Sequence, residues 1–409
     1  MAKRVLLVAQ NFYPEFFKSN DIASDLVARG YKVDVLAGIP NYPEGLFYKG
    51  YGIFRRRVDD YNGAKVYRVY QIPRGRKPGA MRLSLNYLSF AFCSTFWVLF
   101  FLIFKRRYDA IVVHQTSPIT QAWPALLLGR LRRTPIYTWV LDIWPDSVMA
   151  FMSKPRKIIS APLNWFTNRV YRRSRRILIS SPMFRELVNR DHNYDDKIVY
   201  YPNWCEDILS MEDREVPKLD DGFRIMMAGN LSDATGLEGV VEVIKRTKVN
   251  SSIKWTFVGG GNREAWLRET IQREGLTDCC SVLGRYPFEC MASLYKQADI
   301  MFISLKPTTY NHLNATIPAR LQSYIAAGKP IVGMIGEGVT KLVYEINCGR
   351  CVEAGDVEGC AKLILQLADN TAQLKAWGEN ARRYYVEHYT RERCIDNLVD
   401  ITLKGGSIN

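Results

Sequence analysis

Short apolar segments alternate with segments of helical periodicity along both halves of this chain. In the first half the apolar segments are residues 5–9, 33–37, 66–70, 110–113, 135–140 and 176–179. In the second half they are residues 223–230, 254–260, 280–284, 299–304, 330–334 and 350–352. Strands that alternate with helices pair into parallel sheets covered by helices on both faces. The pattern therefore predicts an α/β protein with two doubly wound, Rossmann-like units.

An acidic and polar stretch near residues 205–221 separates the two halves. A chain of 409 residues is long enough for two or three domains. We predict one domain over residues 1–204 and a second over 205–390.

The positive charge of the chain lies in its first half. The net charge is 56 − 41 = +15. Residues 1–204 hold 32 Lys and Arg against 14 Asp and Glu, whereas residues 205–409 hold 24 against 27. This asymmetry indicates an anionic partner, such as nucleic acid, an anionic membrane or a phosphorylated substrate.

The nine cysteines show neither zinc-ligand spacing nor a secretory disulfide pattern. Cys348 and Cys351 form a lone CxxC, which we assign to a turn between a helix and a strand. The chain also begins directly with a strand, so we expect no signal peptide and a reducing, cytoplasmic location.

Residues 83–104 form the most apolar segment, and residues 96–104 are apolar without interruption. The length is borderline for a membrane span. A single crossing cannot, however, return the chain to the sheet that contains both residues 66–70 and 110–113. Basic residues flank both ends (Arg76, Lys77, Arg82, Lys105, Arg106, Arg107). A buried helix pair and a segment that dips into the membrane interface both remain open, and the aromatic content favours the second.

Residues 306–333 are predicted to form a polar loop (306–314), a helix (317–327) and a strand. Thr316 is predicted to cap this helix, and Gly328 to end it. A helix N-terminus that follows a strand favours anions, and Arg320 in its first turn adds a forked donor for phosphate. A loop whose arginine is merely solvated is the alternative.

Other candidate residues follow strands of both halves. Residues 229–236 form a loop that allows close backbone approach to a pyrophosphate. Asp142 and His114 each stand at the end of a strand, where α/β proteins bind ligands. A helix cap for Asp142 and a structural role for His114 are the alternatives.

Several short segments resemble motifs of the GT4 family of GT-B glycosyltransferases and occur in the same order, in particular those of the bacterial O-antigen and capsule transferases. They are NFYPE (11–15), GIPNYPEG (38–45), LNYLSFAF (85–92), TSPI (116–119), LDIWPDS (141–147), YPNWCED (201–207), VGGG (258–261), LGRY (283–286) and IPARLQSYIAAGKPIVG (317–333). The resemblance implies two Rossmann-like domains that face a central cleft, with the last helix (391–409) crossing back to the first domain.

The resemblance also assigns roles to individual residues. The donor-binding residues are Gly229, Asn230, Thr235, Gly259, Arg285, Lys306, Thr316, Arg320 and Ser323. The resemblance places Asp142 at the reaction centre, and its place at a strand end makes His114 the second catalytic candidate. Lys18, Asn41 and Asn203 are expected on the acceptor side. The chain departs from most of the family at two places. Asn230 and Thr235 replace basic residues, and Ala315 and Ser323 replace a glutamate pair.

The expected activity is retaining transfer of a sugar from a UDP-sugar to a lipid diphosphate-linked saccharide, with undecaprenyl as the expected lipid, in O-antigen or capsule synthesis. No Asp-x-Asp sequence occurs, so we expect no metal and no cofactor besides the donor. The enzyme would bind an anionic membrane peripherally through residues 83–107. A UDP-sugar epimerase and a nucleic-acid-binding protein are the alternatives, although no nucleic-acid-binding module is evident.

Overall fold

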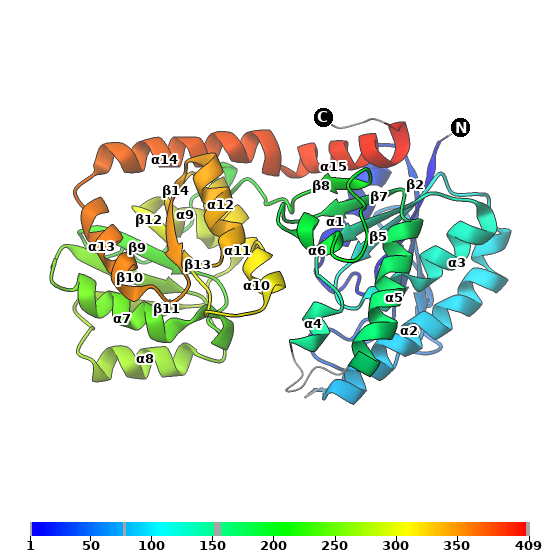
Figure 1. Ribbon diagram of the computed structural model, residues 1–409, viewed down its shortest axis with the longest axis horizontal. Coiled ribbons are helices and arrows are strands. Elements are labelled where there is room, and N and C mark those ends of the chain that lie inside the picture. The colour runs from blue at the N-terminus through cyan, green and yellow to red at the C-terminus, as the bar shows by residue number, and fades with distance from the viewer. Residues whose placement is uncertain (1, 77–78, 151–156, 406–409) are drawn as a thin grey trace. The chain divides into compact units, whose positions relative to one another are not determined.

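The computed structural model describes residues 2–76, 79–150 and 157–405, which fall into two compact α/β units (Figure 1). The first unit comprises Met1–Tyr201 and Ile395–Asn409, and the second comprises Pro202–Cys394. Lys77, one of the basic residues flanking the apolar segment, lies outside the described residues.

The described part of the first unit is built on an eight-stranded sheet in the order β3-β4-β2-β1-β5-β6-β7-β8. Its strands are β1 (Arg4–Val8), β2 (Lys32–Gly38), β3 (Val58–Tyr61), β4 (Ala64–Val69), β5 (Ala110–Gln115), β6 (Ile136–Val140), β7 (Arg176–Ile179) and β8 (Ile198–Tyr200). All pairs are parallel except β3 with β4. The sequence did not predict β3 and β8, because these two edge strands are short and β3 carries two aspartates instead of an apolar run.

Helices connect and cover these strands. They are α1 (Lys18–Ala28), α2 (Ala80–Phe100), α3 (Trp123–Arg132), α4 (Asp146–Met149), α5 (Lys157–Arg173) and α6 (Phe184–Val188), with 3₁₀ turns η1 (Leu102–Phe104) and η2 (Ile119–Ala122). The last helix, α15 (Arg391–Val399), continues as a π-helical turn, η7 (Asp400–Lys404). From Ile395 onward it belongs to the first unit, where Asp396 pairs with Arg29 at 2.9 Å.

The apolar segment forms one long helix, α2, followed by η1. Its buried residues recur every fourth position, at Asn86, Phe90, Ser94 and Val98. The opposite face is apolar as well and is exposed, with Met81, Leu85, Leu88, Phe92, Phe96, Leu99 and Phe100. The helix thus has a narrow inner stripe and an unusually apolar outer face.

By length and composition, residues Ala80–Phe104 could cross a membrane, with a mean hydropathy of 2.0 and 22% of the window buried. The segment nevertheless joins β4 to β5, which run parallel in one sheet. It is therefore the crossover helix of a β–α–β connection, packed beside α3 and β4.

In the second unit the described strands form a six-stranded parallel sheet in the order β11-β10-β9-β12-β13-β14. They are β9 (Phe223–Ala228), β10 (Ile253–Val258), β11 (Cys280–Gly284), β12 (Ile300–Ser304), β13 (Ile331–Ile335) and β14 (Gly349–Glu353). The first strand of this unit, β9, lies at the centre, and the order reverses between β9 and β12. In sheets of this kind the carboxyl edge at the reversal point is where ligands bind.

The helices of the second unit form a layer on each face of this sheet. They are α7 (Leu237–Thr247), α8 (Glu264–Arg273), α9 (Met291–Gln297), α10 (Asn311–Ala315), α11 (Ala319–Ala326), α12 (Glu337–Ile346), α13 (Val357–Leu367) and α14 (Thr371–Tyr384). Shorter turns are η3 (Ile208–Ser210), η4 (Asp233–Thr235), η5 (Phe288–Cys290) and η6 (Tyr385–Tyr389).

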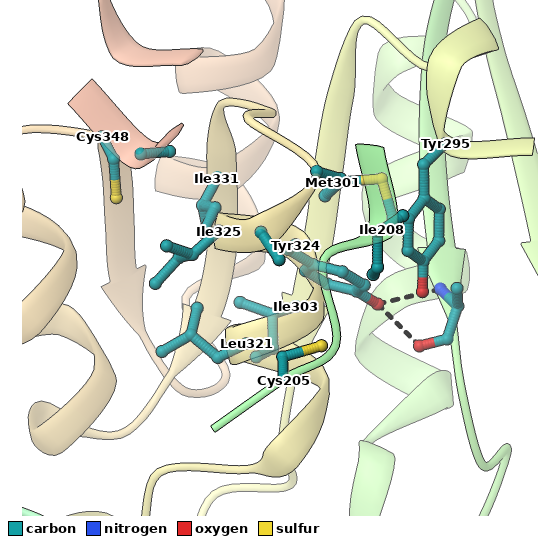
Figure 2. Packing of buried hydrophobic residues seen from close by; sticks show 14 of the residues in the cluster. Cys205, Ile208, Tyr295, Met301, Ile303, Leu321, Tyr324, Ile325, Ile331 and Cys348 are labelled. Carbon is teal, nitrogen blue, oxygen red and sulfur yellow. Dashed lines mark hydrogen bonds between the residues drawn. The ribbon is translucent and has the colours of Figure 1, made fainter. Parts of the chain in front are cut away.

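Alternate residues of the central strands fill two separate cores, as the two-residue repeat of a strand requires. In β12, Met301 and Ile303 pack on the side of α9, α11 and α12, whereas Ile300 and Phe302 pack on the side of α7, α8 and α13. Figure 2 shows the first of these cores around Leu321 and Tyr324.

Candidate functional site

In the second unit, glycine-containing loops follow neighbouring strands at the reversal point. Gly229 follows β9 and has φ +128°, which favours glycine. The next strand, β10, ends before Gly259, where a Cβ atom would lie only 1.9 Å from the carbonyl oxygen of Gly229. The two loops therefore approach each other as closely as backbone can, and side chains are excluded between them.

Arg320 brings a positive charge to these loops. It lies in the first turn of α11, and a Cβ atom at Gly229 would lie 3.8 Å from its Cδ. Its Nη1 is buried and has no hydrogen-bond partner among the described residues. Buried guanidinium groups are normally paired, so an unpaired donor at a strand edge indicates a place for an anionic ligand.

Tyr324, one turn after Arg320, was not among the residues identified from the sequence. Its hydroxyl group donates to the carbonyl oxygen of Ala228 at 2.6 Å and accepts from the amide of Ala228 at 2.9 Å (Figure 2). The side chain is fully buried. It ties α11 to the last residue of β9, directly before the Gly229 loop. A tyrosine in the apolar stripe of a helix was the available signal, but its partner was not visible in the sequence.

The predicted start of this helix was wrong. The presumed loop at 306–314 contains α10, and α11 begins at Ala319 with Pro318 as its N-cap residue. Thr316 does not cap α11, because its hydroxyl group donates to the carbonyl oxygen of His312 at 2.7 Å, at the end of α10. A bond from a serine or threonine hydroxyl group to the carbonyl oxygen four residues earlier competes with capping of the next helix.

The remaining candidates of this unit lie in three settings. Thr235 is buried in the loop after β9. Lys306 lies in the loop after β12 and donates its amide to the carbonyl of Ala234 at 2.8 Å, which joins the two loops. Arg285 follows β11, and its Nε would lie 2.4 Å from a Cβ atom at Gly260. By contrast, the Ser323 hydroxyl lies 3.5 Å from the Cys205 thiol. Asn230 is exposed beside Gly229.

In the first unit, His114 lies near the carboxyl end of β5 and is 2% exposed. Its ring stands edge-on between Phe17 and Trp139, at 6.3 and 5.3 Å. Burial lowers the pKa of His114 to about 3, so the imidazole is neutral at physiological pH. Its Nε2 has no partner among the described residues. A neutral imidazole of this kind can form one hydrogen bond with a ligand but does not act as a general acid.

Asp142 follows β6 and is half-buried. Its two carboxylate oxygens accept hydrogen bonds from the hydroxyl groups of Ser117 and Ser147. Trp144 in turn donates its indole N–H to the Ser117 hydroxyl at 3.1 Å. Asp142 is not the N-cap residue of α4, a position that Pro145 occupies. The carboxylate is thus oriented by two hydroxyl groups at the carboxyl edge of the sheet.

Glu15, at the carboxyl edge of the first unit's sheet, was not predicted from the sequence as a site residue. It is 2% exposed, and one of its oxygens accepts the amides of Asn41 and Tyr42, both at 2.6 Å. Burial raises the pKa of Glu15 to about 7, against the opposing effect of these amides and of Arg74. Its place within NFYPE, beside GIPNYPEG, was the available signal. Glu15 positions Asn41, whose side-chain oxygen accepts the amide of Arg74 at 3.1 Å.

Two acceptor-side candidates remain. Lys18 begins α1 and faces Asp21 at 3.6 Å. Asn203 follows β8 and belongs to the second unit. Among residues 2–76, 79–150 and 157–405, no group of three or more His, Cys, Asp or Glu could hold a metal ion.

Two family models match successive parts of the chain. A "Glycosyl transferase 4-like domain" matches residues 19–204, and "Glycosyl transferases group 1" matches residues 211–384. The chain is 23% identical over 386 residues to glycosyl transferase WcaI of Escherichia coli K12, assigned to colanic acid biosynthesis, covering 89% of this chain and 91% of WcaI. It is 26% identical over 157 residues to the amylovoran biosynthesis glycosyltransferase AmsK of Erwinia amylovora, 38% of each chain.

Solved structures extend the similarity to the whole fold. Sucrose-phosphate synthase of Thermosynechococcus elongatus superposes with a TM-score of 0.72 at 13% identity, covering 98% of both chains. Anabaena Alr3699/HepE in complex with UDP-glucose gives 0.63 at 14% identity, covering 98% of this chain and 100% of the other. At such identities the similarity establishes the fold, which is GT-B.

Proposed function

Because the chain belongs to the GT4 glycosyltransferases, we propose that it transfers a sugar from a UDP-sugar held by its second unit. The observation that supports this proposal is the Nη1 atom of the half-buried Arg320, which is buried without a partner beside Gly229 at the reversal point of the sheet. A diphosphate would satisfy this free donor and could approach the glycine loops closely. The UDP and UDP-glucose complexes of Alr3699/HepE support uridine diphosphate as the carrier.

The Arg320 guanidinium also suits the chemistry of the transfer. When the bond between the anomeric carbon and the diphosphate breaks, negative charge develops on the departing phosphate. Arg320 and the first turn of α11 would stabilise that charge without a metal. In the retaining reaction that we propose, the acceptor hydroxyl forms the new bond to the same face of the sugar. Its proton passes to the departing phosphate.

We assign acceptor binding to the carboxyl edge of the first unit. There Asp142, oriented by two serine hydroxyls, would hold an acceptor or donor hydroxyl group. His114 would contribute a single hydrogen bond as a neutral imidazole, because its pKa of about 3 rules out a charged role near pH 7. Lys18 and Asn41 complete the acceptor side in this proposal.

The acceptor that we propose is a saccharide on undecaprenyl diphosphate, in the synthesis of a bacterial surface polysaccharide such as O-antigen or capsule. The assignment of WcaI and AmsK to colanic acid and amylovoran biosynthesis supports this class. The exposed apolar face of α2 supports peripheral attachment to the inner surface of the cytoplasmic membrane, with the lipid-linked acceptor.

The two alternatives from the sequence are set aside, because both halves match glycosyltransferase models. Incubation of the purified chain with a panel of UDP-sugars and lipid-linked saccharides tests the proposal. It predicts incorporation of one sugar into a lipid-extractable product. Hydrolysis or epimerisation of the donor without incorporation would contradict it.

A further inference from the structure

A cavity of about 590 Å³ opens at the amino edge of the first unit's sheet, opposite to the edge that carries His114 and Asp142. It lies where β6 and β7 begin, between the C-terminal ends of α3 and α5. None of the residues assigned to catalysis or donor binding lines it. Its lining therefore calls for an explanation of its own.

The lining is strongly basic. Six cationic side chains and one carboxylate, Asp196, face the cavity; the cationic ones are Arg130, Arg133, Arg173, Arg175, Arg176 and Lys197. Within the described part of the chain, none of the six forms a salt bridge with a carboxylate. Arg176 donates to the backbone carbonyl of Asp196, and Lys197 to that of Arg172 at 3.0 Å. Arg130, Arg133, Arg173 and Arg175 are exposed, and like charges gathered around one hollow attract an anion.

Helix dipoles explain only part of this cluster. Arg130 and Arg173 lie in the last turns of α3 and α5, where a cation offsets the partial negative charge of the helix end. Arg133, however, lies beyond α3 with a left-handed φ of +51°. Arg175 and Arg176 lie at the start of β7 and are not in a helix. The excess charge is therefore a property of the cavity.

A buried hydroxyl group supplies a second, independent observation. Thr134 lines the cavity, is 4% exposed, and its Oγ1 has no hydrogen-bond partner among the described residues. Buried hydroxyl groups are normally bonded. Ser174, which also lines the cavity, is fully bonded, to Thr138 at 2.8 Å and to the carbonyl of Val170 at 2.9 Å. Thr134 thus places a buried hydroxyl group without a partner in the wall of the cavity that the arginines also line.

The cavity adjoins the apolar end of α2. Arg132 donates to the carbonyl oxygen of Lys105 at 3.2 Å, and Arg107 donates to that of Arg133. Just before Lys105, Phe104 is 80% exposed. The segment beside the cavity therefore carries an exposed aromatic side chain, which favours contact with a membrane surface when the phosphate belongs to a lipid headgroup.

We propose that this cavity is a second anion site of the protein, which binds phosphate groups through its arginines and Thr134. Guanidinium groups bind phosphate oxygens in pairs, and six cations suit a ligand with more than one negative charge. The phosphate could belong to an anionic lipid headgroup or to a soluble diphosphate. The site does not depend on the glycosyl transfer proposed above.

Calorimetric titration with sodium pyrophosphate, in protein saturated with UDP so that the donor site is filled, tests the proposal. We expect binding that weakens at least tenfold in the double variant Arg130→Ser/Arg175→Ser. The matched control is Lys245→Ser/Arg246→Ser on α7, which removes the same charge from the second unit and should bind as the wild type does. Absence of binding to the wild type, or equal affinity in all three proteins, would overturn the site.

Two further measurements sharpen the test. Thr134→Val should weaken pyrophosphate binding several-fold without loss of thermal stability, whereas a purely structural threonine would give the reverse. Flotation with phosphatidylglycerol vesicles identifies the source of the phosphate. A loss of vesicle binding in the double variant assigns the site to a lipid headgroup, and unchanged vesicle binding beside lost pyrophosphate binding assigns it to a soluble ligand. UDP affinity, measured on the same variants, reports separately on the donor site.

Discussion

The hydroxyl group of Tyr324 binds both backbone polar groups of Ala228, donating to its carbonyl oxygen at 2.6 Å and accepting from its amide at 2.9 Å. Ala228 is the last residue of β9, and the glycine loop begins at the next residue. Tyr324 therefore fixes α11, with Arg320 one turn earlier, against the loop that we assign to the diphosphate. Donor binding should depend on this tyrosine although it lies behind the ligand.

Replacing Tyr324 with phenylalanine should lower the free energy of unfolding by about 1–3 kcal/mol, because two buried backbone groups lose a partner. It should also weaken UDP binding, since α11 is released from β9. Urea denaturation and calorimetry measure the two effects. The control is Tyr344→Phe, at a 68% exposed position. Equal stability of the two variants would show that Ala228 does not need the hydroxyl group.

Replacing Asp142 with asparagine should leave the fold and UDP affinity intact and lower sugar transfer at least tenfold. Asparagine keeps one acceptor for Ser117 or Ser147 but loses the negative charge that we assign to the acceptor side. Asp146→Asn, a nearby change of the same kind at a carboxylate that pairs with Arg190, is the control. Near-normal turnover in Asp142→Asn would show that the carboxylate orients its own loop and takes no part in the transfer.

Glu15 should give the protein a characteristic pH dependence. Its pKa is about 7 in the folded state against 4.5 ordinarily, so the folded state holds an extra proton between these values. Stability should therefore fall as the pH rises from 4.5 to 7, by about 1.4 kcal/mol per unit and about 3 kcal/mol in all. Glu15→Gln should lack this fall.

The measurement is the free energy of unfolding of wild type and Glu15→Gln at pH 5 and pH 8. His114 titrates in the opposite direction, because its lowered pKa makes the protein more stable as the pH rises through the range between about 3 and 6.5. Since both proteins contain His114, its effect cancels in the difference. A difference that does not change with pH would contradict the elevated pKa of Glu15.

Membrane binding should depend on the outer face of α2. The triple variant Phe92→Ser/Phe96→Ser/Phe100→Ser removes three exposed rings without touching the buried stripe. We expect reduced binding to anionic vesicles, and the salt-insensitive part of the binding should disappear. The control is Phe288→Ser on the second unit, where the side chain is 45% exposed. Vesicle binding equal to that of the control would place the membrane contact elsewhere or exclude it.

The sequence predicted the buried strands well, because parallel strands leave continuous apolar runs. Residues 176–179 and 280–284 coincide with β7 and β11, and the other apolar segments agree with their strands to within two residues. The edge strands β3 and β8 of the first sheet were missed, since β3 contains two aspartates and β8 has only three residues. The GT-B fold and the glycosyltransferase class were recognised from motifs in order and are confirmed.

Details that depend on side-chain partners could not be read from the sequence. The polar segment at 306–314 looked like a loop, yet five residues from Asn311 form α10, and their formation leaves Thr316 at a helix end instead of a helix start. Similarly, nothing in the local sequence of Glu15 shows that folding brings it to the amides of Asn41 and Tyr42, 26 and 27 residues away. Arg320 could be identified from the sequence because the features that indicate its role, a helix start and the strand before it, lie within one short segment.

The most direct test of a donor site built around Arg320 is calorimetric titration of UDP into wild type, Arg320→Ala and Arg246→Ala. Arg246 lies on the exposed side of α7 in an i,i+4 pair with Glu242, so its removal deletes the same charge from the same unit. Loss of a charge-assisted bond costs about 1.5–3 kcal/mol. We predict that Arg320→Ala binds UDP at least tenfold more weakly than both other proteins. Equal affinity in all three would contradict the donor site.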